Sequence, residues 1–179
     1  MNSAEADILF SPDELEQKVK ELGKKISQNF AGEELLVVGI LKGAFIFMAD
    51  LVRAIDLPVA IDFMDVSSYG MSSLSSGEVR IIKDLDFSIQ DKNVLIVEDI
   101  IDTGLTLNYI VEILKKRDPK SVSICCLLDK PSRRKSSIKP DYVGYTIADE
   151  FVVGYGLDYA EKYRNYPAVY ILKPSVYEK

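Results

Sequence analysis

The stretch that decides the fold of this chain is Val94-Leu95-Ile96-Val97-Glu98-Asp99-Ile100-Ile101-Asp102-Thr103-Gly104-Leu105-Thr106-Leu107. Four apolar residues lead into two adjacent carboxylates, a third carboxylate follows three residues later, and a Thr-Gly-x-Thr sequence begins a helical pattern. A buried strand, an acidic turn and a helix start therefore lie within fourteen residues. In α/β proteins this arrangement is typical of sites for phosphorylated ligands, because helix N-termini and the carboxyl ends of parallel strands meet there.

Strand and helix patterns alternate on both sides of this stretch. Residues 35–40 are a continuous apolar run, as expected of a strand that is buried on both faces of a sheet, and residues 122–128 predict a further buried strand. Residues 11–14 (Ser-Pro-Asp-Glu) are typical of a helix start, with a hydroxyl cap, an early proline and a glutamate three residues after the serine. Residues 44–55 predict a second helix. We therefore predict an α/β fold with a mostly parallel central sheet and helices on both faces.

The remaining segments predict shorter elements. Residues 59–66 and 79–83 are strand-like, and the Ser- and Gly-rich residues 67–77 between them predict a mobile loop or the tip of a short hairpin. The last fifty residues contain strand-like pieces at 142–146 and 169–172 and no clear helical pattern. The sequence contains no internal repeat and no linker, so we expect a single domain over the whole chain (1–179) with a small mobile hood or loop region.

The net charge and the cysteines indicate which kinds of partner and which cellular compartment suit this protein. The formal net charge is −6 and the pI is near 4.8, which argues against nucleic acid as the main partner, because phosphate backbones require a basic surface. The short basic run Arg133-Arg134-Lys135 is typical of a solvated loop. No apolar run reaches the length of a membrane span. Cys125 and Cys126 are adjacent and point to opposite faces of a strand, so we expect them to be core residues of a reduced, cytoplasmic protein.

The chain contains no histidine. Acid–base chemistry must therefore be carried out by the side chains of Asp, Glu, Lys, Tyr or Cys. A Ser-His-Asp triad and a histidine-ligated zinc site are excluded for the same reason.

Residues 102–106 (Asp-Thr-Gly-Leu-Thr) have the composition of a phosphate-binding turn. A phosphate monoester requires several short donors and no crowding side chain, and backbone N–H groups, a glycine and two hydroxyls supply these. The alternative is that Asp102 or Thr103 only caps the helix. Glu98 and Asp99 point in opposite directions at the strand end, where carboxylates suit Mg²⁺. The alternative for this pair is that both carboxylates are solvated.

The stretch from Val94 to Thr106 closely resembles the phosphoribosyl-pyrophosphate motif of the type I phosphoribosyltransferases, and it is similar to their 6-oxopurine branch, the hypoxanthine-guanine phosphoribosyltransferases. The resemblance covers nearly the whole chain. The further matches, in chain order, are Leu41-Lys42-Gly43 to the pyrophosphate loop, Ser68-Tyr69 to the mobile catalytic loop, Lys130 to the lysine that reads the purine's exocyclic oxygen, Phe151-Val152 to the base-stacking segment, and Asp158-Tyr159 to Arg164 to the closing motif.

This resemblance implies transfer of a phosphoribosyl group from 5-phosphoribosyl 1-pyrophosphate to a ring nitrogen of hypoxanthine, guanine or xanthine. It implies that Asp102 is the general base, and that a homodimer or homotetramer forms. The implied sugar-phosphate contacts are Thr103, Gly104 and Thr106 on the 5-phosphate, Lys42, Gly43 and Arg164 on the pyrophosphate, and Glu98 and Asp99 on the ribose, directly or through metal-bound water. The implied Mg²⁺ ligands are Glu98, Asp99 and Asp158.

Several alternatives remain open from the residues themselves. Leu105 stands where some family members carry lysine, which removes a possible cationic contact. Lys42 and Lys130 could also be solvated lysines, and Phe151 could be a core residue. Asp158 and Arg164 could form an ordinary ion pair on the surface.

Two other classes of function also fit parts of the sequence. One is a regulatory protein that senses the ligand and binds RNA or a protein, and the other is a receiver-like phospho-acceptor domain with Mg²⁺ at its strand ends.

Overall fold

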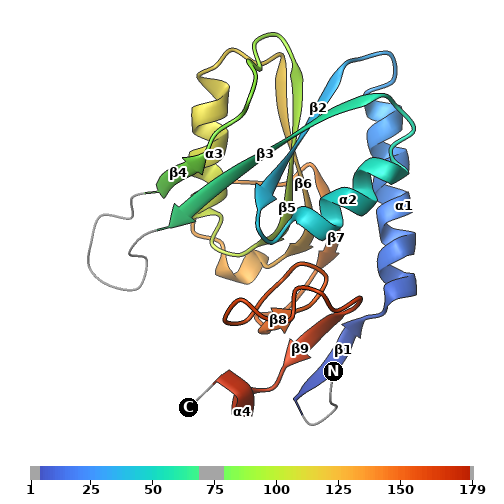
Figure 1. Cartoon of the computed structure of the whole chain (residues 1–179), viewed down its shortest axis with the longest axis vertical. Helices are drawn as coiled ribbons and strands as arrows, with labels where there is room; N and C mark the ends of the chain where they lie inside the picture. The colour runs from blue at the N-terminus through green and yellow to red at the C-terminus, as the bar shows by residue number, and fades with distance from the viewer. Residues whose placement is uncertain (1–4, 69–78, 178–179) are drawn as a thin grey trace.

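The computed structural model of this protein describes residues 5–68 and 79–177. Within them, the larger sheet has the strand order β4-β3-β2-β5-β6-β7, in which only β4 pairs antiparallel (Figure 1). Its strands are β2 (Leu35–Leu41), β3 (Val59–Ser68), β4 (Val79–Lys83), β5 (Asn93–Ile101), β6 (Ser121–Asp129) and β7 (Tyr142–Thr146). The predicted mostly parallel sheet is confirmed.

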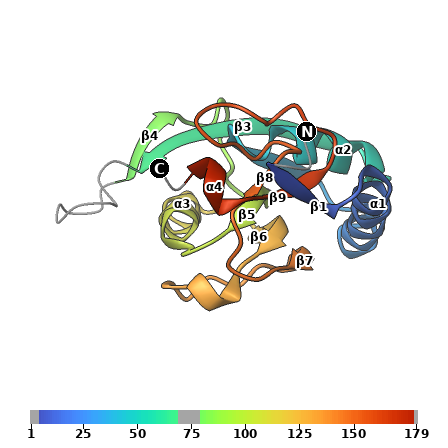
Figure 2. The same ribbon diagram turned by 90° about the horizontal axis from the view of Figure 1, so that it is seen from below.

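Helices cover both faces of this sheet, as the sequence predicts. The view in Figure 2 shows α1 (Pro12–Asn29) and α2 (Phe45–Ala54) on one side and α3 (Leu105–Lys115) on the other. Alternate residues of the central strands β2 and β5 belong to two separate apolar cores, because successive side chains of a strand point to opposite faces. Val37, Leu95 and Val97 pack in the core that contains α1 and α2, and Val38, Val94 and Ile96 pack in the core that contains α3.

The start of α1 follows the predicted capping pattern. The backbone N–H of Glu14 donates to Oγ of Ser11 at 3.3 Å, and the backbone N–H of Ser11 donates to Oε2 of Glu14 at 2.8 Å. These reciprocal bonds satisfy two backbone donors that have no partner inside the helix.

A smaller antiparallel sheet lies beyond the carboxyl ends of the parallel strands, and its strand order is β1-β9-β8 (Figure 1). It consists of β1 (Ala6–Phe10), β8 (Val152–Val153) and β9 (Val169–Leu172), followed by the short helix α4 (Pro174–Tyr177). The sequence predicts β9 but neither β1 nor β8. Both are short, and their backbone hydrogen bonds depend on β9, which is distant from β1 in the chain.

The acidic residues after Val97 lie in a different element from the one that the sequence predicts. Strand β5 continues to Ile101, so Glu98 and Asp99 lie inside the strand rather than after it. Ser68 ends β3 and pairs with Val79 of β4, so residues 69–78 connect two antiparallel strands. Tyr69 and most of the predicted mobile loop lie outside the described residues. In the described part of the chain, no helix is both long and apolar enough to cross a membrane.

Candidate active site

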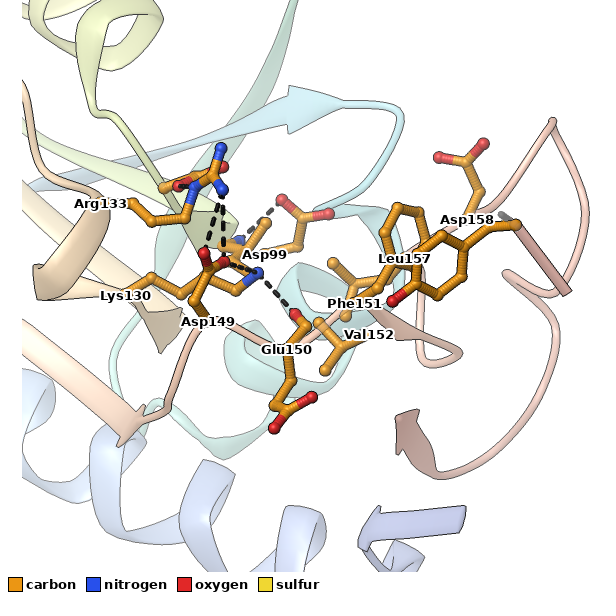
Figure 3. A pocket seen from close by; sticks show the side chains of 12 residues that line it. Asp99, Lys130, Arg133, Asp149, Glu150, Phe151, Val152, Leu157 and Asp158 are labelled. Atoms are coloured by element: carbon orange, nitrogen blue, oxygen red, sulfur yellow. Dashed lines mark hydrogen bonds and ion pairs between the residues drawn. The ribbon is translucent and has the colours of Figure 1, made fainter. Parts of the chain in front are cut away.

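A cavity of about 520 Å³ lies at the carboxyl edge of the larger sheet, where the segments that lead to the smaller sheet cross it (Figure 3). Ligands of open α/β sheets bind at this edge, because the connecting loops there are free to form a crevice. The residues that line the cavity are Asp99, Ile100, Asp102, Lys130, Arg133, Asp149, Glu150, Phe151, Val152, Leu157, Asp158 and Tyr177. Six of the residues singled out in the sequence, Asp99, Asp102, Lys130, Phe151, Val152 and Asp158, therefore meet in one cavity.

A second cavity of about 230 Å³ contains the predicted phosphate turn. Glu98, Thr103, Gly104 and Thr106 line it. Asp102 lines both this cavity and the larger one. Asp102 therefore lies at the boundary between the two cavities.

Gly104 gives the phosphate turn its shape. It precedes α3 with φ of +73°, and a Cβ atom at this position would lie 2.4 Å from Oγ of Ser136. Only glycine adopts this conformation and fits this space at low cost. Gly104 is the N-cap residue of α3, and Asp102 pairs with Arg133. The alternative in which Asp102 caps the helix is therefore wrong, whereas the hydroxyl of Thr103 does accept a hydrogen bond of 3.4 Å from the backbone N–H of Leu105 at the start of α3.

Glu98 and Asp99 point to opposite faces of β5, as predicted, and enter different cavities. Asp99 is 8% exposed, and its Oδ1 accepts a hydrogen bond of 2.8 Å from the backbone N–H of Ile100. Burial raises the pKa of Asp99 to about 6, against the opposing charge of Arg164. Burial and the neighbouring Asp99 hold the pKa of Glu98 well above its usual value, and its Oε2 is buried without a hydrogen-bond partner among the described residues. These carboxylates are not solvated.

The Lys42-Gly43 turn packs against both Asp99 and the C-terminal segment. A Cβ atom on Gly43 would lie 1.8 Å from Oδ2 of Asp99, and a Cβ atom on Gly156 would lie 2.1 Å from the carbonyl oxygen of Gly43. The ammonium of Lys42 pairs with Glu161 at 2.9 Å, although both side chains are exposed. Glycine is therefore required at positions 43 and 156 because backbone and carboxylate approach each other closely.

Asp158 and Arg164 form a partly buried pair rather than an ordinary surface pair. Oδ1 of Asp158 lies 2.9 Å from Nη2 of Arg164, and the Arg164 side chain is 20% exposed. Nη1 of Arg164 donates to the carbonyl oxygen of Gly156 at 2.9 Å, while its Nε is buried without a hydrogen-bond partner in the part of the chain that the structure describes. The unpaired Nε and the unpaired Oε2 of Glu98 are buried polar groups that a bound ligand or ion would satisfy.

Lys130 is buried at the end of β6 and is not a solvated lysine. It is 8% exposed, and its Nζ donates to the carbonyl oxygen of Glu150 at 2.6 Å. Phe151 is 38% exposed, so it is not a core residue. Its ring stacks on Tyr177 with a centroid distance of 4.9 Å and meets the edge of Tyr159 at 5.6 Å. The aromatic face that the sequence predicted is thus present, with a C-terminal tyrosine against it.

Several residues of the site are not predicted by the sequence. The basic run was expected to be a solvated loop, but the side chain of Arg134 is 14% exposed, pairs with Asp129 and donates to the backbone oxygen of Asp102 at 3.1 Å. Arg133 of the same run lines the larger cavity, as do Asp149, Leu157 and Tyr177, which the sequence did not single out. The only signal for the two arginines was that their run follows an apolar strand, at the edge where the site was expected.

Carboxylate ligands for a cation are available on both sides of β5. Asp99 and Asp158 line the larger cavity, and Glu98 lines the smaller one. Among residues 5–68 and 79–177, no three acidic or cysteine side chains gather closely enough to form a metal site by themselves. The donor set is composed of hard oxygens, which suits Mg²⁺ when substrate oxygens and water complete its coordination.

Comparison with known proteins identifies the class to which this fold and site belong. The family model described as phosphoribosyl transferase domain matches residues 6–160, so this chain belongs to the phosphoribosyltransferase family. It is 57% identical over 171 residues to the hypoxanthine-guanine phosphoribosyltransferase of Bacillus subtilis (strain 168), covering 96% of this chain and 95% of that protein.

Solved structures agree with this assignment. The crystal structure of a hypoxanthine phosphoribosyltransferase from Staphylococcus aureus superimposes with a TM-score of 0.94 at 52% identity, covering 97% of this chain and 94% of that chain. A structure of the hypoxanthine phosphoribosyltransferase of Trypanosoma cruzi gives a TM-score of 0.93 at 40% identity, and the alignment covers 99% of this chain and 97% of that chain.

Proposed function

We propose that this protein is a purine-salvage enzyme that transfers the phosphoribosyl group of 5-phosphoribosyl 1-pyrophosphate to hypoxanthine or guanine, with xanthine as a third candidate acceptor. The products are the nucleoside 5′-monophosphate and pyrophosphate. The observation that carries the proposal is the position of Asp102 between the larger cavity and the phosphate turn. A carboxylate at this boundary lies where a purine and a phosphorylated sugar would meet.

The sugar phosphate is assigned to the smaller cavity. Backbone N–H groups at the start of α3 and the hydroxyls of Thr103 and Thr106 would donate to the 5-phosphate beside Gly104. Lys42 and Arg164 would offset the charge that builds up on the leaving pyrophosphate. The ion pairs of these two residues with Glu161 and Asp158 hold both cations near the Lys42-Gly43 turn before the substrate binds.

Mg²⁺ fits the residues that are present. Glu98, Asp99 and Asp158 would bind Mg²⁺, directly or through water, Asp99 and Asp158 from the larger cavity and Glu98 from the smaller one on the other face of β5. The unpaired Oε2 of Glu98 and the buried Asp99 would each gain from a nearby cation. The ion, when bound, would neutralise charge on the pyrophosphate oxygens.

The purine is assigned to the larger cavity. The Lys130 ammonium carries three N–H donors, of which the carbonyl of Glu150 accepts one. The others are available to a purine carbonyl oxygen and cannot accept from an exocyclic amine, which favours 6-oxopurines over adenine. The Phe151 ring would stack on the base, and Val152 and Asp158 would contact its remaining edge.

Asp102 is proposed as the general base. In the reaction, one imidazole nitrogen of the purine forms the bond to the anomeric carbon while the bond to pyrophosphate breaks, and Asp102 accepts the proton from the other nitrogen. Closure of the loop that contains Ser68 and Tyr69 would exclude water, which otherwise hydrolyses the activated sugar.

We also propose that the chain acts as one domain in a cytoplasmic homodimer or homotetramer. The thiols of Cys125 and Cys126 are buried and free, as expected in a reducing compartment. Ile61 of β3 and Ile82 of the neighbouring strand β4 are 55% and 61% exposed. A second subunit could cover these two apolar side chains.

A substrate panel tests the proposed function. The purified protein is incubated with 5-phosphoribosyl 1-pyrophosphate and hypoxanthine, guanine, xanthine or adenine, with Mg²⁺ or with a chelator, and pyrophosphate release is measured. We expect product with hypoxanthine and guanine, none with adenine, and none without the metal. Binding of the sugar pyrophosphate without turnover on any base would favour the regulatory alternative, and an acid-labile phosphoprotein would favour the receiver-like alternative.

A further inference from the structure

Arg133 connects two walls of the larger cavity, and the proposed function assigns it no role. Its Nε donates to Oδ1 of Asp102 at 2.6 Å, and its Nη1 lies 3.1 Å from Oδ2 of Asp149. Figure 3 shows dashed lines from the guanidinium of Arg133 to the carboxylate of Asp149, beside Lys130. The three residues come from separate segments, which are the turn after β5, the short helix η1 (Pro131–Arg133) and the connection between β7 and β8.

The charge pattern continues to Lys130. Oδ1 of Asp149 lies 3.8 Å from Nζ of Lys130, which is itself held by the carbonyl oxygen of Glu150. Asp102, Arg133, Asp149 and Lys130 therefore form a chain of alternating charge along the wall of the cavity, which we call the bridge. Its two ends are the proposed general base and the lysine proposed to read the purine oxygen.

We infer that Arg133 and Asp149 are positioning residues that hold the general base and the purine-reading lysine in register, an inference that rests on the proposed function. Two different nitrogens of one guanidinium contact the two carboxylates, and this fixed fork is a property of arginine that the single ammonium of lysine lacks. The bridge thus sets the separation between the group that accepts the purine proton and the group that binds the purine oxygen.

The geometry at Asp102 supports this role. Arg133 occupies Oδ1, and among the hydrogen bonds of the described residues none involves Oδ2 of Asp102. With one oxygen fixed, the other is oriented as the acceptor for the purine N–H, which must come within about 3 Å for proton transfer. When Asp102 accepts the proton and loses its charge, Asp149 still pairs with Arg133, so the guanidinium is not left without a counter-charge.

The bridge is partly exposed to solvent. We therefore expect it to orient the side chains of Asp102 and Lys130 rather than to stabilise the fold. The side chains of Arg133 and Asp102 are 45% and 41% exposed. Exposed ion pairs contribute little to the free energy of unfolding, whereas small errors in the position of a catalytic group reduce the rate strongly.

Steady-state kinetics of Arg133→Met, Arg133→Lys and Asp149→Asn test the inference. Loss of the bridge should lower kcat about tenfold, less than the loss of the base itself, with the KM for 5-phosphoribosyl 1-pyrophosphate unchanged. Arg133→Lys should recover only part of kcat, because its ammonium cannot reproduce the two-point contact. Arg117→Met is the matched control, since Arg117 makes two 2.8 Å hydrogen bonds to Asp84 away from both cavities, and it should leave kcat unchanged.

A double-mutant cycle with Asp102→Asn separates positioning from a purely structural role. If Arg133 acts through Asp102, Arg133→Met should have little further effect on kcat when Asp102 is already Asn. Full wild-type kcat in Arg133→Met and Asp149→Asn, full recovery in Arg133→Lys, or an undiminished effect in the Asp102→Asn background would each overturn the inference. Failure of the proposed function is distinguishable, because the wild-type protein would then show no transfer to any 6-oxopurine. Thermal melting of each variant checks that the fold is retained.

Discussion

The two halves of the site differ in burial and in how they are assembled. The sugar-phosphate half, defined here as Lys42, Gly43 and residues 98–106, consists mainly of one continuous strand–turn–helix in which Asp99 and Oε2 of Glu98 are buried. The purine half, defined as Lys130, residues 149–152, Leu157, Asp158 and Tyr177, gathers distant segments around the partly exposed ring of Phe151.

Because of this difference, we expect the two halves to respond differently to pH, to the metal and to substitutions. Buried carboxylates with raised pKa values make the sugar-phosphate half sensitive to protonation and to the metal. The purine half depends on contacts between side chains that solvent partly screens. Substitutions that affect one half and leave the other unchanged therefore test the division.

The largest effect is expected at the boundary between the halves. Asp102→Asn should lower kcat by about 10²–10⁴-fold, because it removes the proposed proton acceptor. Binding of 5-phosphoribosyl 1-pyrophosphate, measured by calorimetry, should remain nearly intact, since the phosphate turn keeps its backbone. Unchanged turnover would remove Asp102 from the role of base.

The next effect concerns the buried charge of the sugar-phosphate half. The folded state raises the pKa of Asp99 from 3.8 to about 6, so between these pH values it retains a proton that the unfolded chain has released. The contribution of Asp99 to stability therefore decreases as pH rises through this window, and the loss amounts to about 3 kcal/mol above pH 6 in the metal-free protein. Asp99→Asn should be more stable than wild type by this amount at pH 7, and the difference should vanish below pH 4.

Urea unfolding in the presence of a chelator, at pH values from 4 to 7, measures this difference. The same variant should bind 5-phosphoribosyl 1-pyrophosphate with Mg²⁺ more weakly, since a carboxylate ligand is lost. Equal stability of the two proteins at pH 7 would show that Asp99 is not charged in a buried environment.

Lys130→Ala should affect the purine half alone. A hydrogen bond from a charged group is worth about 1.5–3 kcal/mol, so binding of hypoxanthine or guanine should weaken about 10–100-fold. The affinity for the sugar pyrophosphate should not change. Lys130→Met, which keeps most of the aliphatic stem, separates the ammonium from packing, and equal losses for both ligands would contradict the assignment of Lys130 to the purine.

The smallest effect is expected for Gly104→Ala in the phosphate turn. A left-handed conformation costs an alanine roughly 1–2 kcal/mol of folding stability, and the new Cβ would displace the turn from Oγ of Ser136. This displacement, rather than the strain, which is present with and without ligand, should raise the Kd for 5-phosphoribosyl 1-pyrophosphate about tenfold. Gly32→Ala is a matched control, since Gly32 has φ of +79° with nothing within 4 Å of the added Cβ. It should cost stability without changing ligand affinity, and a similar Kd change in both variants would show that strain alone is responsible.

The parallel sheet, its covering helices and the contiguous part of the sugar-phosphate half could be predicted from the residues alone. Continuous apolar runs such as Val94–Val97 require burial on both faces, and the residues from Glu98 to Thr106 are contiguous, so local spacing already places them together. Tertiary structure alone decided the smaller sheet, the stacking of Tyr177 on Phe151, and the pairing of Arg133 with Asp102 and Asp149. These contacts join residues far apart in the chain, and an arginine in a polar loop has the same local sequence whether it faces solvent or a carboxylate across a cavity.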